Sequence, residues 1–161
     1  MEKIKIRAIE KADRPWANNI MIEHWGATRM VSRGRVYDAG ELPGFIAVLG
    51  NEIAGIATYH IAGSECELTT LNSLVEGKGI GTALLTAVRD AAAAAGCRRL
   101  WLISTNDNTH ALHFYQKRGY LLVAVYRNAV EHSRKLKPEI PLLGNDGIPL
   151  RDEIELELPL K

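Results

Sequence analysis

The sequence predicts a single α/β domain, residues 1–161, with a mixed sheet and helices on both of its faces. Segments with the alternating or wholly apolar pattern of strands take turns along the chain with amphipathic helical segments. Glycine-containing turns separate several neighbouring strand segments closely enough for hairpins. The 161 residues, of which 47% are hydrophobic, are enough for one domain core and too few for two.

The N-terminal half is expected to hold four strands and one helix. The helix is capped by Asp13 and ends at Gly26. The next segment, residues 26–43, is rich in Gly, Arg and Ser, and we expect an irregular surface excursion there. The strand segments of this half are residues 3–7, 44–49, 52–61 and 66–74, with a hairpin turn at Gly50-Asn51.

The C-terminal half is expected to alternate helices and strands. The helices cover residues 80–95, 108–119 and 128–137, and the strands cover residues 100–103, 121–126 and 154–158. The last strand alternates strictly, which predicts an edge strand with Glu155 and Glu157 facing water. A homodimer contact at this edge and a monomer are both compatible with the sequence. The Pro- and Gly-rich residues 138–149 form either a passive cover or a substrate-facing lid.

Charge and composition argue against several kinds of partner. The formal net charge is +1, which gives no electrostatic reason to expect nucleic acid as a partner. No stretch approaches the length that spans a membrane, and the first residues lack the apolar run of a signal peptide. Cys66 and Cys97 have neither metal-binding nor redox spacing. We therefore expect a cytoplasmic protein without a metal.

The most informative segment joins a strand to a helix through Gly77, Gly79 and Gly81. Glycines at such a junction let backbone N–H groups approach a bound phosphate, and the positive end of the helix favours an anion. A P-loop is excluded because Lys78 is followed by Gly79, and a dinucleotide fingerprint is excluded because position 82 is Thr82. A glycine turn of purely structural use stays open as the alternative.

Two segments in order resemble the GNAT family of N-acetyltransferases. The first is Glu76-Gly-Lys-Gly-Ile-Gly81, and the second contains Asn108, Ala111, Phe114, Tyr115, Gly119 and Tyr120. The resemblance covers about residues 4–127 and leaves a helix, loop and strand in residues 128–161. It implies a mostly antiparallel sheet whose central strands splay apart. Glu76 stands where the family usually has Gln or Arg.

The resemblance implies acetyl-CoA as co-substrate. Backbone donors of the glycine segment would hold its pyrophosphate, and the preceding strand would pair with its pantetheine arm. The expected coenzyme-binding residues are Leu71, Asn72, Ser73, Gly77, Lys78, Gly79, Ile80, Gly81, Thr82 and Asn108. Lys78 is either a direct contact or a solvated surface lysine. Asn108 suits both a helix N-cap and a hydrogen bond to the pantetheine amide.

Tyr115 is the expected general acid, because the family carries a tyrosine there to protonate the leaving thiolate. A buried structural tyrosine is the alternative. For the general base we favour Glu67 over Glu65. The period of two places both on one face with Leu71, so that either could face the cleft. A chain of water molecules is the alternative to both.

The acceptor is expected to be a primary amine, on a small molecule or exposed on a protein. The expected contacts are His24, Trp25, Arg29, Arg33 and Tyr37, together with the region of residues 132–137. The arginines are suited to a carboxylate or phosphate on the acceptor. Because of Glu76, a catalytically degenerate acyl-CoA-binding or regulatory module is the alternative function.

Overall fold

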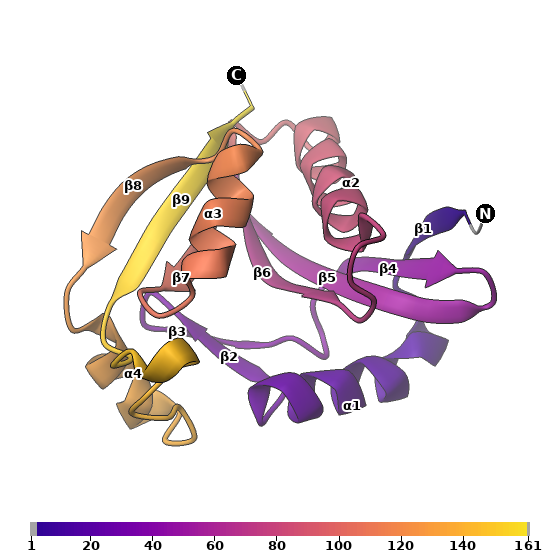
Figure 1. The fold of residues 1–161 in the computed structure, drawn as a ribbon. Coiled ribbons are helices and arrows are strands. Elements are labelled where there is room, and N and C mark those ends of the chain that lie inside the picture. The colour runs from indigo at the N-terminus through magenta and orange to yellow at the C-terminus, as the bar shows by residue number, and fades with distance from the viewer. Residues whose placement is uncertain (1–2, 161) are drawn as a thin grey trace.

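A computed structural model describes residues 3–160 and contains two sheets (Figure 1). The larger has seven strands in the order β1-β4-β5-β6-β7-β9-β8, and the smaller pairs β2 with β3. The strands are β1 (Ile4–Ala8), β2 (Arg29–Ser32), β3 (Arg35–Asp38), β4 (Gly44–Leu49), β5 (Glu52–Ala62), β6 (Glu65–Ser73), β7 (Arg99–Thr105), β8 (Leu121–Tyr126) and β9 (Glu153–Pro159). The helices are α1 (Arg14–Trp25), α2 (Ile80–Ala94), α3 (Thr109–Lys117) and α4 (Ala129–Leu136), with 3-10 turns η1 (Lys11–Asp13) and η2 (Asn145–Gly147).

The large sheet is mixed and mostly antiparallel, as expected. Its only parallel neighbours among the described strands are β6 and β7, which pair from Glu65↔Arg99 to Glu67↔Trp101. Beyond Glu67 both strands continue without pairing to each other, β6 to Ser73 and β7 to Thr105. The expected splay of the central strands is therefore confirmed.

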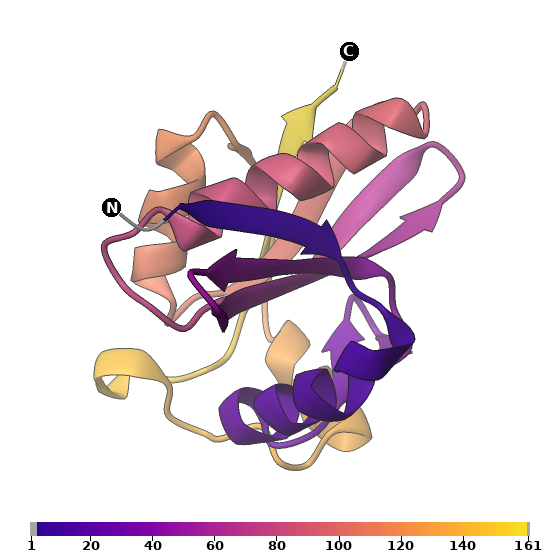
Figure 2. The same cartoon turned by 90° about the vertical axis from the view of Figure 1, so that its right-hand side faces the viewer.

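Alternation along β4 and β5 builds two apolar layers on opposite faces of the sheet. Ile46 and Ile56 pack with Met21 of α1, whereas their neighbours Ala47 and Ala57 join the cluster that contains Leu84 of α2. Figures 1 and 2 show α1 and α2 on these two faces. Helix α3 shares the face of α2, and α4 lies with α1 and the β2–β3 hairpin on the other. Among residues 3–160, no helix has the length and apolar character needed to cross a bilayer.

The expected irregular excursion over residues 26–43 is wrong in its centre, where β2 and β3 form a hairpin. The turn residues Arg33 and Gly34 both have positive φ, 51° and 76°, as a tight hairpin turn requires. Each strand has only four residues. Such short strands with several polar residues carry too little apolar pattern to be recognised from sequence.

The expected edge position of the last strand is also wrong, because β9 lies between β7 and β8. Glu155 is only 6% exposed, and its carboxylate accepts hydrogen bonds from Arg99 and from the Tyr126 hydroxyl, both at 2.7 Å. Glu157 is half-buried and pairs with Arg99 at 3.0 Å. The alternating glutamates look the same in the sequence whether their side chains face water or a buried cation. The edge strand at this end of the sheet is β8, with Leu121, Leu122, Val123 and Val125 exposed. A dimer contact at this edge, which stays a prediction, would therefore involve β8.

Candidate active site

The splay of β6 and β7 opens into two adjoining cavities. The larger has a volume of about 560 Å³ and the smaller about 130 Å³. The residues that line both come from β6, from β7 and from the start of α3: Leu68, Thr69, Ile103, Ser104 and Asn108. The two cavities therefore meet where the strands have separated.

The smaller cavity contains Tyr115, on α3. The side chain is 8% exposed, and its ring makes edge contacts with Phe114 and Tyr120 at 5.1 and 5.5 Å between centroids. Burial raises the pKa of Tyr115 above its ordinary value of 10.0. Within the described part of the chain, the Tyr115 hydroxyl has no hydrogen-bond partner. A protonated hydroxyl beside a cavity can donate its proton to a bound ligand.

The glycine segment begins where β6 ends. Gly77 and Gly79 have φ of 73° and 74°, and a Cβ built on either residue would meet no atom within 4 Å. Gly79 is the N-cap of α2, so the backbone N–H groups of Ile80, Gly81 and Thr82 lie in its first turn, where a helix leaves them without internal partners. The open left-handed glycines beside unpaired donors suit a phosphate-bearing ligand. Glu76 and Lys78 are exposed beside them.

The other coenzyme-site residues expected from sequence lie on either side of this segment. Leu71 lines the smaller cavity, and Asn72 and Ser73 continue β6 from there into the glycine loop. The Ser73 hydroxyl donates to the Val75 carbonyl oxygen at 2.9 Å. Asn108 caps α3, because its Oδ1 accepts a hydrogen bond from the Ala111 N–H at 3.0 Å. The N-cap prediction for Asn108 is therefore confirmed.

Arg118 adds a positive charge here that the sequence analysis missed. Its Nε donates to Thr82 Oγ1 at 3.0 Å, and its Nη1 donates to the Phe114 carbonyl oxygen at 2.9 Å. The guanidinium also lies 3.8 Å above the centre of the Phe114 ring. These contacts hold a cation beside the N-terminus of α2. Arg118 and Thr82 are 36 residues apart, so only the tertiary structure brings them together.

Glu67 lines the larger cavity and is 3% exposed. Its carboxylate accepts a hydrogen bond from Ser32 Oγ at 2.5 Å and interacts with the Tyr37 hydroxyl, both from the β2–β3 hairpin. Burial raises the pKa of Glu67, although these two hydrogen bonds oppose the shift. A carboxylate with a raised pKa that lines a cavity is suited to take up a proton from a bound ligand.

Glu65, the other candidate base, is occupied elsewhere. Its carboxylate pairs with Arg98 and with Arg99, the latter at 3.0 Å, and it lines neither cavity. Burial acts to raise the pKa of Glu65, but the two arginines outweigh it and hold that pKa below its ordinary value. The expectation that side chains alternate between the two faces along the whole of β6 is also wrong. Thr69 has no Cα partner on β5, so the alternation is interrupted there.

A second buried carboxylate, Glu153, lines the same cavity as Glu67 and was not anticipated. It is 4% exposed and accepts a hydrogen bond from Ser133 Oγ at 3.2 Å. Burial raises the pKa of Glu153, and its charge also acts to raise the pKa of Glu67. In the sequence Glu153 belongs to the alternating glutamates of the last strand, so nothing local sets it apart.

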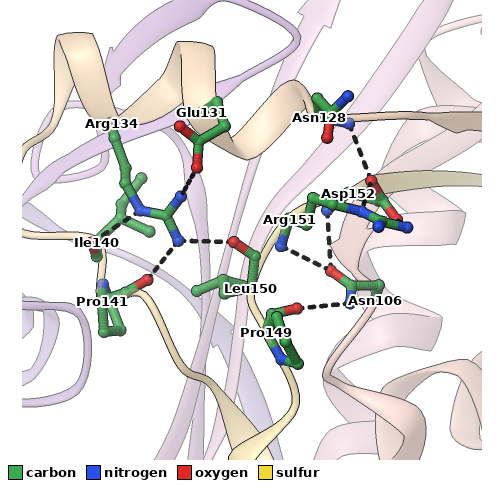
Figure 3. Close-up of polar contacts among 10 residues, drawn as sticks. All are labelled: Asn106, Asn128, Glu131, Arg134, Ile140, Pro141, Pro149, Leu150, Arg151 and Asp152. Carbon is green, nitrogen blue, oxygen red and sulfur yellow. Dashed lines mark hydrogen bonds and ion pairs between the residues drawn. The ribbon is translucent and has the colours of Figure 1, made fainter.

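The outer wall of the larger cavity is the loop after α4, which a polar network fixes in place (Figure 3). Arg134 donates to three carbonyl oxygens of this loop, those of Ile140, Pro141 and Leu150, at 3.3, 2.6 and 2.6 Å. Asn106 donates to the Pro149 carbonyl oxygen at 2.8 Å and accepts from the N–H groups of Arg151 and Asp152 at 3.0 and 2.9 Å. Of the two alternatives for this loop, the structure supports the one in which it faces the cavity.

Of the acceptor contacts expected from sequence, His24, Tyr37 and residues 133 and 137 line the larger cavity, whereas the two arginines lie at or beyond its rim. Arg29 pairs with Glu139, a lining residue, at 3.6 Å, and Arg33 lies 3.4 Å above the centre of the Tyr126 ring. Within residues 3–160, neither arginine belongs to the lining of the two cavities. Trp25 ends α1, and its side chain lies outside the described part of the chain. Among the described lysines and arginines, Lys137 is the one that lines the larger cavity.

Comparison with known proteins decides the family. Residues 8–120 match the acetyltransferase (GNAT) family. The chain belongs to this family. It is 51% identical over 133 residues to the uncharacterized protein YdhI of Bacillus subtilis (strain 168), covering 82% of this chain and 83% of YdhI. It is 47% identical over 135 residues to the uncharacterized protein YxbD of the same organism, covering 83% and 85%.

Solved structures of GNAT acetyltransferases share the fold. The IAA acetyltransferase of Bacillus cereus ATCC 14579 superposes with a TM-score of 0.76 at 20% identity, covering 98% of this chain and 99% of that one. A GNAT acetyltransferase of Elizabethkingia anophelis with acetyl-CoA bound gives 0.72 at 20% identity, covering 97% of each chain. In this GNAT chain, the described residues contain no group of three or more His, Cys, Asp or Glu side chains arranged to hold a metal ion.

Proposed function

We propose that this GNAT protein transfers an acetyl group from acetyl-CoA to a primary amine by direct attack. One observation carries the proposal: the two cavities meet in the gap between β6 and β7, with Glu67 in the larger and Tyr115 in the smaller. Glu67, a buried proton acceptor, and Tyr115, a buried proton donor, would therefore lie on either side of the reacting atoms. Binding of acetyl-CoA in the Elizabethkingia relative supports the choice of co-substrate.

The co-substrate would lie along the gap and the glycine segment. Backbone donors from Gly77 to Thr82 would receive the pyrophosphate, with Arg118 and Lys78 as nearby cations. The edge of β6 that faces β7, at Leu71, Asn72 and Ser73, would pair with the pantetheine arm. Because Asn108 uses its side-chain oxygen to cap α3, its NH₂ group is the part left to donate to a pantetheine carbonyl.

The acceptor would enter the larger cavity as an ammonium ion. Glu67 would take one proton from it, and the neutral amine would attack the carbonyl carbon of the acetyl group. The resulting C–N bond replaces the C–S bond, while the nitrogen gives up its second proton to solvent. Tyr115 would donate its proton to the departing sulfur and regain one from water. The net products are an N-acetyl amine, CoA thiol and one proton.

A small-molecule amine is the acceptor that the cavity favours. The volume of about 560 Å³ has the size of a site for a small ligand, and the fixed loop after α4 closes one side of it. An amine exposed on a protein is the alternative.

Cys66 and Cys97 are buried free thiols, which is consistent with the expected cytoplasmic location.

The test combines binding with turnover. Calorimetry with acetyl-CoA would measure binding, and release of free CoA thiol across a panel of amines would measure transfer, with mass spectrometry to identify the acetylated product. We expect both binding and transfer. Binding without thiol release on any small or protein amine would support the alternative function, a degenerate acyl-CoA-binding module. No binding at saturating acetyl-CoA would refute both.

A further inference from the structure

Lys137 is a buried cation in the wall of the larger cavity, and the proposed chemistry does not use it. Its side chain is 6% exposed, and it follows α4 directly, one turn after Ser133. Its backbone N–H donates to the Ser133 carbonyl oxygen at 2.8 Å. Within residues 3–160, the ammonium group of Lys137 makes no hydrogen bond and no ion pair. Such a group costs free energy unless a partner arrives.

Two other partly buried cations, Arg99 and Arg134, are satisfied internally. Arg99 pairs with Glu65, Glu155 and Glu157 at 3.0, 2.7 and 3.0 Å. Arg134, on the same helix as Ser133, holds carbonyl oxygens of the loop and Glu131. Lys137 differs from both because its ammonium lacks any such partner among the described residues while it lines a cavity of ligand size.

The charged groups around Lys137 do not neutralise it. Glu139 is the nearest acid in the chain and acts to raise the lysine pKa, but its carboxylate is paired with Arg29 at 3.6 Å. Burial lowers the pKa of Lys137, and the positive charge of Arg29 lowers it further. Attraction between Lys137 and the negative end of the α4 dipole does not explain why the lysine is buried, because a solvent-exposed lysine would make the same interaction. The buried position therefore points to an anion supplied by a ligand.

The charged residues that line the larger cavity therefore change sign along α4. Ser133 touches Glu153, and Lys137 lies one helical turn further, at a spacing of about 5–6 Å between side-chain origins. Glu67 lines the same cavity as a second buried acid. One part of the cavity therefore favours an ammonium group, and another part favours a carboxylate.

We infer that the acceptor is an amino carboxylate, whose ammonium group lies at Glu67 and whose carboxylate pairs with Lys137. This inference rests on the proposed function and names its substrate class. A plain amine would leave Lys137 without a partner. A diamine would bring its second ammonium group against that of Lys137. An amino carboxylate satisfies both parts of the cavity.

The test compares matched pairs of acceptors that differ only by a carboxylate. The pairs are glycine and methylamine, β-alanine and ethylamine, 4-aminobutanoate and propylamine, and 5-aminopentanoate and butylamine. We expect at least one amino carboxylate to exceed its plain amine in kcat/KM by about tenfold or more, the effect of one charge-assisted hydrogen bond. Lys137→Met should abolish this advantage mainly through KM, whereas Lys137→Arg should retain part of it. Lys135→Met is the matched control and should keep the advantage, because this exposed lysine of α4 lines neither cavity.

Three outcomes would overturn the inference and leave the proposed function standing. The first is a ratio near unity for all four pairs, and the second is an advantage that survives in Lys137→Met. A preference for 1,4-diaminobutane or for 2-aminoethyl phosphate over every amino carboxylate would also overturn it. Circular dichroism of each variant would establish that it is folded.

A second measurement separates the inference from the proposed function. Calorimetry of the same amines against protein saturated with CoA detects the anion site without turnover. If no acceptor is acetylated but an amino carboxylate binds and Lys137→Met removes that binding, the carboxylate site stands and the transferase proposal fails. If no amino carboxylate binds or reacts, the inference is refuted.

Discussion

Glu67 and Trp101 form the last residue pair between β6 and β7. The same residue that ends the pairing therefore supplies the carboxylate at the mouth of the gap that follows. The loss of β-sheet hydrogen bonds and the position of the proposed base have one structural origin. Because the backbone of β6 is anchored on its other side by β5, the carboxylate is held at a defined place rather than on a loose end.

Glu67→Gln tests the general base. We expect kcat/KM to fall by about 10²-fold or more, the usual contribution of a positioned base. Burial raises the pKa of Glu67 above its ordinary value of 4.5, so the acidic limb of the wild-type pH profile should lie above that value and disappear in the variant. Glu65→Gln, the alternative base, should retain the limb. Persistence of the limb in Glu67→Gln would exclude Glu67.

Glu67→Gln, although expected to lower activity, is not expected to lower the stability of the fold. A carboxyl group whose pKa is raised by folding contributes stability below its unfolded pKa, and that contribution is lost as pH rises through the folded pKa. Glu67→Gln should therefore be at least as stable as the wild type at pH 7 by thermal unfolding. Loss of activity in a fully stable variant would separate a chemical role from a structural one.

Tyr115→Phe tests the general acid. The phenyl ring keeps the packing against Phe114 and Tyr120 but removes the proton, so we expect kcat to fall by about tenfold or more while calorimetry finds acetyl-CoA binding unchanged. Tyr120→Phe is the control, because that buried tyrosine lines neither cavity. Equal kcat in the two variants would remove Tyr115 from its role.

Arg118→Ala tests the cation beside the glycine segment. We expect the Kd for CoA to rise by about three- to tenfold at low ionic strength, and less at high salt, because the guanidinium is exposed and screened. Arg89→Ala removes an equal charge from an exposed position further along α2 and should leave the Kd unchanged. A similar rise in both variants would indicate a general charge effect.

Asp13→Asn tests the link between β1 and the start of α1. The Arg7 guanidinium, 2.7 Å from Asp13, is the main cause that lowers the pKa of this carboxyl to about 2. A lowered pKa stabilises the fold above the unfolded value of 3.8, and this stabilisation is lost as pH falls toward 2. We expect the variant to lose about 1 kcal/mol of unfolding free energy at pH 7, since water screens the exposed Arg7. The loss should vanish near pH 2, as measured by urea denaturation.

The parts of the fold that the sequence predicted are those with strong local signals. Gly79 and Gly96 mark the limits of a long apolar stripe, and α2 is found between them. Asn108 caps α3 as its residue type suggested. In the same way, Tyr115 was selected by its position in a motif, and the structure places it beside a cavity.

The parts that the sequence missed depend on contacts between distant segments. Ser32 and Glu67 are 35 residues apart, and the hairpin that carries Ser32 has too little apolar pattern to be recognised. Glu153 is one of several alternating glutamates, and only the insertion of β9 beside β7 turns it toward a cavity. The sequence points to residues 132–137 as an acceptor contact, but it does not single out Lys137 over Arg29 and Arg33, because burial in the cavity wall cannot be read from the sequence.

The clamp formed by Arg134 has a consequence for engineering. A single guanidinium fixes three carbonyl oxygens of the cavity wall, so the wall keeps its shape through backbone contacts while its side chains stay free to vary. Ile140 and Leu150 belong to this braced stretch and line the cavity. Trimming either of them offers a route to bulkier acceptors that leaves the scaffold untouched, provided that Arg134 is retained.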